Sequence, residues 1–404
     1  MSQAAEIFVC SEPSDRALRD DLCARIAPLV EAGLVREFPS EPADGLPTAR
    51  VTSADVVVAL VSPEALAPGS TVNTVITEAL AMERQQRTVL IPVRARACSL
   101  DAGPLEDRVV YPRDASALDS ESQREYAFRD AIAGVLTGIT LCHVTVGDLL
   151  LQNERETAAA SAFRHALSIA ERLSSDFPDD VDHLTLLSLV RDRLGEALLA
   201  MGDGPGALAA FQSAKAAHER LVTAAVDRAS RRRLLARCVE SIGDVLRAMG
   251  DKPLALKTFQ DCLSLRKELA NETGDVTSRR EVASTYVRIG HVLRALGDST
   301  GALAAFRDGM ALADALAREA GAASSSALVT QAEVAVFQAE RALFCFRTAS
   351  VLAEGGQDER DEARGLLLQA IGMYHDLETR GVLPESHKIW PPAAEAMLNT
   401  LDVS

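Results

Sequence analysis

Four polar residues near the start of the chain are spaced as parts of one ligand-binding site would be. Ser11, Asp15 and Arg16 follow the first apolar run, IFV, and Ser62 follows a later one, Asp55–Val61. Both runs predict strands. Open α/β sheets bind their ligands at the carboxyl ends of neighbouring parallel strands. We therefore expect these hydroxyl, carboxylate and guanidinium groups to surround a single ligand.

The cysteines and histidines show no pattern that binds a metal. The seven cysteines are scattered, without a C-x-x-C pair, and the seven histidines lack ligand spacing. An odd number of scattered cysteines argues against a disulfide framework and fits a reducing compartment. We expect no metal, no prosthetic group and a cytoplasmic protein.

Residues 1–138 alternate short apolar runs with amphipathic stretches. This alternation predicts an α/β domain with a small parallel sheet and a flavodoxin-like, doubly wound arrangement. The buried run Asp55–Val61 would be its central strand. The other expected strands are Ile7–Val9, Leu34–Phe38, Thr88–Val93 and Arg108–Tyr111, and the expected helices are Ala17–Glu31, Val72–Gln85 and Glu121–Leu136.

Three segments of this domain resemble the Toll/interleukin-1 receptor (TIR) family: IFVCSEPSD, ADVVVALVSPEAL and TVNTVITEALAMERQQRTVLIPV. Many bacterial and plant members cleave NAD and release nicotinamide, and their key residue is a glutamate on the helix that matches Glu78 here. The resemblance implies that NAD is a substrate, that the Glu78 carboxylate stabilises a ribosyl cation, and that TIR domains self-associate. One departure is that only PSEPADGLPTARVTSA separates Phe38 from Asp55, where the family has a full helix.

The rest of the chain contains an internal repeat of 47–48 residues. It begins with a glycine, followed twelve residues later by an alanine and four further on by a phenylalanine. Each copy predicts a helical hairpin in which the glycine lets the second helix approach closely. Single hairpins cannot bury their apolar faces, so the copies must stack. The glycines are Gly147, Gly195, Gly243 and Gly290, and the phenylalanines are Phe163, Phe211, Phe259 and Phe306.

This pattern resembles the tetratricopeptide repeat (TPR), with a longer period than the family's usual one. We expect four long repeats over residues 139–320 and a degenerate fifth hairpin over 321–380, with helices at Thr330–Leu352 and Asp361–Leu377. Residues 381–404 would be a capping tail in which Trp390 covers the last repeat. The chain is therefore predicted to be an α/β domain followed by an all-α TPR solenoid that binds a protein or peptide in its groove.

Charge and hydropathy restrict the partners further. The formal net charge is −16, and such a protein repels phosphate backbones, so we expect no nucleic acid. The acidic balance suggests a basic partner segment. The sequence lacks an apolar run of about 18 residues, so we expect no membrane span.

Two functions fit these observations. In the first, the repeats sense a protein partner and the TIR domain then hydrolyses NAD, as in bacterial proteins of antiviral defence. In the alternative, the chain is a non-catalytic adaptor. A third class, a nucleotide-binding domain of the response-regulator kind, lacks its acidic pair and any G-x-G-x-x-G. An open cleft between Glu78 and the loop at 10–16 would favour the enzyme, and a cleft filled by Leu46–Val51 would favour the adaptor.

Overall fold

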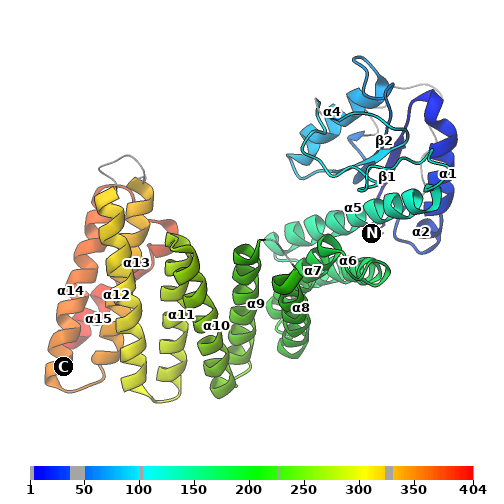
Figure 1. Ribbon diagram of the computed structural model, residues 1–404. Coiled ribbons are helices and arrows are strands. Elements are labelled where there is room, and N and C mark those ends of the chain that lie inside the picture. Colours follow the sequence, from blue (N-terminus) through cyan, green and yellow to red (C-terminus); the bar gives the residue numbers. More distant parts are fainter. Residues whose placement is uncertain (1–3, 37–50, 101–102, 225–226, 324–330, 404) are drawn as a thin grey trace. The chain divides into compact units, whose positions relative to one another are not determined.

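The computed structural model describes residues 4–36, 51–100, 103–224, 227–323 and 331–403. It confirms the expected architecture of a small parallel sheet followed by a long all-helical repeat array (Figure 1). The chain forms two compact units, residues 1–217 and 218–404, which divide within α8 (Gly204–Ala224). Each unit is described by itself below.

The sheet of the first unit has three parallel strands in the order β1-β2-β3. They are β1 (Ile7–Cys10), β2 (Val56–Val61) and β3 (Val89–Arg94), close to three of the predicted strands. The predictions of the other two strands are wrong within the described residues. The expected strand at 34–38 is a single bridge from Val35 to Ala5, with Phe38 outside the described residues, and the one at 108–111 is a bridge from Tyr111 to Val93.

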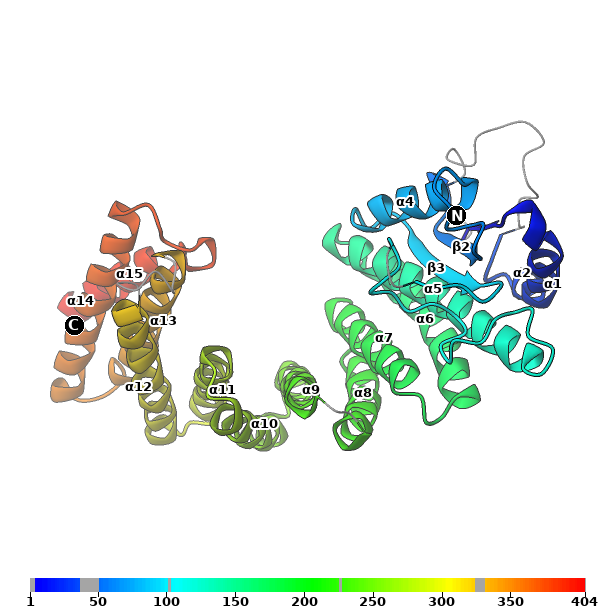
Figure 2. The same cartoon turned by 45° about the horizontal axis from the view of Figure 1, so that its top comes forward.

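Helices cover both faces of this sheet. On one face, α4 (Thr71–Glu83) packs against alternate strand residues such as Phe8 and Val57 in a single buried cluster. Its first turn is capped by Ser70, whose hydroxyl accepts the Asn73 amide at 2.9 Å. On the other face lie α1 (Arg16–Ile26) and α5, while the short α2 (Pro28–Glu31) follows α1 (Figure 2).

One helix, α5 (Arg124–Gln152), replaces the predicted short closing helix at 121–136 and the start of the first repeat. Residue 138, the predicted end of the first domain, lies inside it. Gly134 and Gly138 let α5 lie close to the sheet, because a Cβ there would come within 2.6 Å of the Tyr111 ring and 2.8 Å of Ile91. By length and composition α5 is apolar enough to cross a membrane, but 56% of its most apolar window is buried inside the fold.

The helices after α5 form antiparallel hairpins, as the repeats predict. In the first unit, α5 pairs with α6 (Glu156–Asp176), and α7 (Val181–Ala200) pairs with α8. The second unit contains α9 (Arg228–Ala248), α10 (Lys252–Thr273), α11 (Val276–Ala295) and α12 (Ser299–Ala323).

Each repeat glycine lies directly against the ring of its own repeat phenylalanine. A Cβ on Gly243, for example, would lie 2.6 Å from the Phe259 ring, and the other three pairs are equally close, at 2.4 to 2.8 Å. All four rings are almost completely buried. The close approach expected at the repeat glycine is therefore made by the phenylalanine ring, which occupies the space that a side chain would need.

The fifth hairpin and the cap close the second unit. The hairpin consists of α13 (Gln331–Leu352) and α14 (Gln357–Thr379), and the tail forms the short η3 (Glu385–His387) and α15 (Trp390–Val403). Tyr374 is fully buried between the two hairpin helices, in a cluster against which Trp390 packs. Trp390 therefore covers the last hairpin, as predicted.

Candidate functional sites

The carboxyl edge of the sheet brings two of the predicted site residues together. Asp15 and Ser62 are both fully buried, and the Ser62 hydroxyl donates to Asp15 Oδ2 at 2.6 Å. A third residue completes this group: Arg96, just after β3, donates from Nε to Asp15 Oδ1 at 2.7 Å. Asp15, Ser62 and Arg96 thus form one hydrogen-bonded cluster at this edge of the sheet.

Arg96 also bonds to two other residues at this edge of the sheet. Its Nη2 donates to Ser14 Oγ at 2.9 Å and to Glu64 Oε2 at 2.6 Å. These ion pairs with Asp15 and Glu64 raise the pKa of Arg96, and the hydrogen bond that Arg96 donates to Asp15 has the largest effect. One guanidinium therefore ties together the loops that follow all three strands. The feature of the sequence that could have indicated Arg96 is a charged residue shortly after a buried strand.

The remaining predicted residues are arranged differently. Ser11 Oγ is buried and has no hydrogen-bond partner among the described residues, while Arg16 is exposed at the start of α1. Glu78 is half-buried on α4 and makes no hydrogen bond or ion pair with the described residues. The 10–16 loop meets α4 at Val72, whose amide donates to Glu12 at 3.2 Å. Glu78 is six residues further on, about 9 Å along the helix axis.

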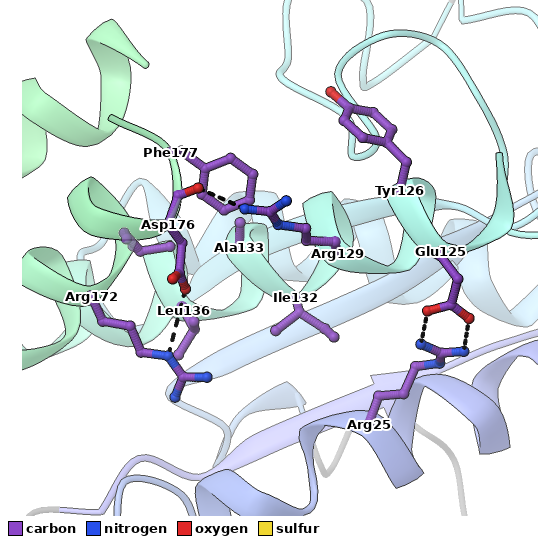
Figure 3. Close-up of a pocket in the computed structure, with 11 residues that line it drawn as sticks. Arg25, Glu125, Tyr126, Arg129, Ile132, Ala133, Leu136, Arg172, Asp176 and Phe177 are labelled. Carbon is purple, nitrogen blue, oxygen red and sulfur yellow. Dashed lines mark hydrogen bonds and ion pairs between the residues drawn. The ribbon is translucent and has the colours of Figure 1, made fainter. Parts of the chain in front are cut away.

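A groove of about 540 Å³ lies between α1, α5 and α6 (Figure 3). Its apolar part comes from two helices of the first hairpin, with Ile132, Ala133 and Leu136 on α5 and Leu173 on α6. Phe177, just beyond α6, closes one end, and Tyr126 is 48% exposed at the other. Ile132 is half-buried, whereas Ala133, Leu136 and Leu173 are almost completely buried. The part of the groove that is open to solvent is therefore formed by Ile132, Tyr126 and the exposed arginines Arg129 and Arg172.

Three arginines form the rim of this groove. The Arg25 guanidinium donates to both carboxylate oxygens of Glu125, at 3.0 and 2.7 Å, and lies 4.4 Å from the centre of the Phe128 ring. Arg129 donates to the Asp176 carbonyl at 2.6 Å and stacks on Phe177. Arg172, the third, is exposed. Within the described residues, Arg129 has no carboxylate partner, so the rim carries positive charge available to a ligand.

In the second unit, neighbouring first helices of the hairpins are joined by charged contacts along one face. Arg288 on α11 pairs with Glu240 and Asp244 on α9, at 3.2 and 3.1 Å. Arg294 on α11 donates to Ser350 Oγ on α13 at 3.5 Å. This face of α9, α11 and α13 is called the arginine face below.

Comparisons with known proteins find only solved structures of similar fold. No family model matches the chain, and no curated protein matches it. Among solved structures, BtubC (BKLC) from P. vanneervenii is 14% identical with a TM-score of 0.46, over 64% of this chain and 87% of that one. A putative kinesin light chain of Podosopora anserina with nearly identical TPR-like repeats is 13% identical, with a TM-score of 0.38 over 59% and 94%. A Rap protein complexed with competence and sporulation factor is 14% identical, with a TM-score of 0.34 over 81% and 92%.

Proposed function

We propose that this chain is a non-catalytic interaction scaffold whose helical hairpins bind a segment of another protein. The observation that carries the proposal is the groove of Figure 3, which combines an apolar surface from α5 and α6 with a rim of arginines. Ile132 and Tyr126 expose apolar surface there, and exposed apolar surface beside charged side chains is typical of protein-binding grooves.

The sheet edge supports the same choice. Asp15 and Ser62, two of the residues expected to hold a substrate, are hydrogen-bonded to each other and to Arg96. Val51, the last residue of the segment expected to fill or open the cleft, is fully buried in the cluster beneath α4; residues 46–50 lie outside the described ones. Because these side chains bond to one another, few of their donor and acceptor atoms remain to bind a substrate.

Replacing Ile132 in the groove by aspartate is expected to abolish partner binding. A carboxylate there would need to be desolvated when an apolar segment docks, which costs well over 1 kcal/mol. The measurement is affinity purification of the tagged full chain from its native cells, with quantitative mass spectrometry of the retained proteins. Val109→Asp, at an aliphatic residue of the same unit that is 55% exposed, is the matched control.

The proposal fails if wild type retains no specific protein, or if Ile132→Asp and Val109→Asp retain the same partner equally. Circular dichroism of both variants establishes that each is folded. Sedimentation velocity of the purified chain separately tests self-association through the sheet domain, which the TIR resemblance implies.

NAD hydrolysis by a TIR-type site is the second candidate. Ser11 favours it, because its buried hydroxyl at the sheet edge has no partner and a bound ligand would supply one. For a scaffold we expect no nicotinamide release above background, from either wild type or Glu78→Ala, when the concentrated protein is incubated with NAD and followed by chromatography. Release by wild type that Glu78→Ala abolishes would establish the enzyme instead.

A further inference from the structure

The arginine face surrounds a single imidazole, His291 on α11. Burial has the largest effect on the pKa of His291 and, together with the charges of Arg347, Arg294, Arg247 and Arg288, lowers it to about 4. The four arginines come from three helices, α9, α11 and α13, and their positive charge therefore converges on one place. The neutral His291 adds no charge at pH 7.

Two of these arginines are neutralised within the chain and two are not. Arg288 pairs with Glu240 and Asp244, and Arg247 pairs with Asp244 at 3.3 Å. Within the described part of the chain, Arg294 has only the Ser350 hydroxyl, and Arg347 has no carboxylate and no hydrogen-bond partner for its buried Nε.

Arg347, which is half-buried, differs from a buried arginine in the same unit. Arg266 is 4% exposed, and it donates to the Glu240 carboxylate at 2.6 Å and to Thr285 Oγ1 at 2.6 Å. Arg347 instead has the Trp390 ring, whose centre is 5.7 Å from its Cζ. Burial lowers the pKa of Arg347 to about 10. A guanidinium withdrawn from water without an anion is unfavourable, and an incoming carboxylate relieves that cost.

Other donors near Arg347 also lack acceptors. The hydroxyl of the fully buried Tyr374 and the Nε2 atom of His387, which is 8% exposed, have no hydrogen-bond partner among the described residues. The charge of Arg347 acts on both side chains. It opposes the rise in the pKa of Tyr374 that burial causes, and it contributes to the lowering of the pKa of His387. The end of α13 is therefore rich in donors and poor in acceptors.

Ser350 connects α11 with the turn of α13 that carries Arg347, which lies three residues earlier and on the same side of that helix. The Ser350 hydroxyl accepts from Arg294 Nη1 and donates to the Arg347 carbonyl at 2.7 Å. We infer that the arginine face binds an acidic segment of a partner protein, with a glutamate or aspartate carboxylate received between Arg294 and Arg347. This inference goes beyond the proposed groove of the first unit, and it reverses the sequence-based expectation of a basic partner.

The net charge of −16 makes such a site selective. An acidic segment is repelled by most of the surface and attracted only where guanidinium groups exceed carboxylates, so binding is local and depends on geometry. It also weakens as salt concentration rises.

The test is fluorescence anisotropy with the full chain and a short fluorescein-labelled peptide of alternating glutamate and serine. We expect saturable binding that weakens with salt and falls about tenfold for Arg294→Gln and for Arg347→Gln, the loss of one charge-assisted hydrogen bond. Arg294 is exposed, so its variant is not expected to disturb folding. Arg318→Gln, at an exposed arginine of α12, should bind like wild type.

Four outcomes would overturn the inference. The first is no saturable binding of the glutamate peptide, and the second is an equal loss of binding in Arg318→Gln. The third is displacement of the peptide by an equimolar amount of inorganic phosphate, which would indicate a site for small anions. A lysine–serine peptide that bound as tightly as the glutamate peptide would contradict it as well. None of these results depends on Ile132 or on the groove of Figure 3.

Discussion

Gly243→Ala is expected to destabilise the second unit by about 2–4 kcal/mol, because the added methyl group would overlap the Phe259 ring. The overlap is with a fully buried aromatic ring, which has no free space into which to move. Removing the ring instead, by Phe259→Ala, leaves a cavity and costs about 3–5 kcal/mol. Urea unfolding followed by circular dichroism measures both losses. The double variant Gly243→Ala with Phe259→Ala should lose less stability than the sum of the two single changes.

Gly365→Ala is the matched control. Gly365 also lies within a helix of the second unit, α14, but a Cβ there meets nothing within 4 Å. Alanine at an open helical position stabilises by up to about 1 kcal/mol. Equal stability of the two alanine variants would show that the contact between Gly243 and Phe259 does not constrain the hairpin.

Arg96→Met is expected to cost the first unit about 3–5 kcal/mol, because it leaves the fully buried Asp15 carboxylate without its charged partner. The Ser62 hydroxyl would be the remaining side-chain donor to that carboxylate. Adding Asp15→Asn to the same chain removes the unpaired charge and should restore part of the stability. Urea midpoints of the single and double variants give the comparison.

Arg172→Met provides the reference for an exposed ion pair. Arg172 Nε lies 3.7 Å from Asp176, and both side chains are about half exposed, so the loss should stay below about 1 kcal/mol. If Arg96→Met unfolds at the same urea concentration as Arg172→Met, the sheet edge does not depend on the bonds of Arg96.

The hairpins could be predicted well because their determinants are local and repeated. A glycine and a phenylalanine sixteen residues apart reveal a contact when the spacing recurs four times. The expected strands at 34–38 and 108–111 had no such support, and each is reduced to one bridge in the described residues. The continuity of α5 was not predicted, although Gly134, Gly138 and Gly147 all lie within it and all allow close packing.

The sites were harder to predict because they depend on which side chains neutralise one another. Asp15 and Ser62 were correctly placed at one edge of the sheet, but Arg96 was not expected between them. Arg347 was not singled out either, since an arginine on a helix usually reaches water or a carboxylate. Its lack of a partner emerges only when α11, α13 and the tail are packed together.

The single helix α5 has a consequence for how such chains can evolve. Gly138 faces the sheet, and Gly147, nine residues later, faces Phe163 from about the opposite side of the same helix. Inserting one residue between them would rotate the two contacts by about 100° relative to each other and shift them by about 1.5 Å. The sheet and the first hairpin therefore cannot be exchanged as independent modules. The number of residues between these two glycines should stay constant in descendants of this chain, even where the residues themselves change.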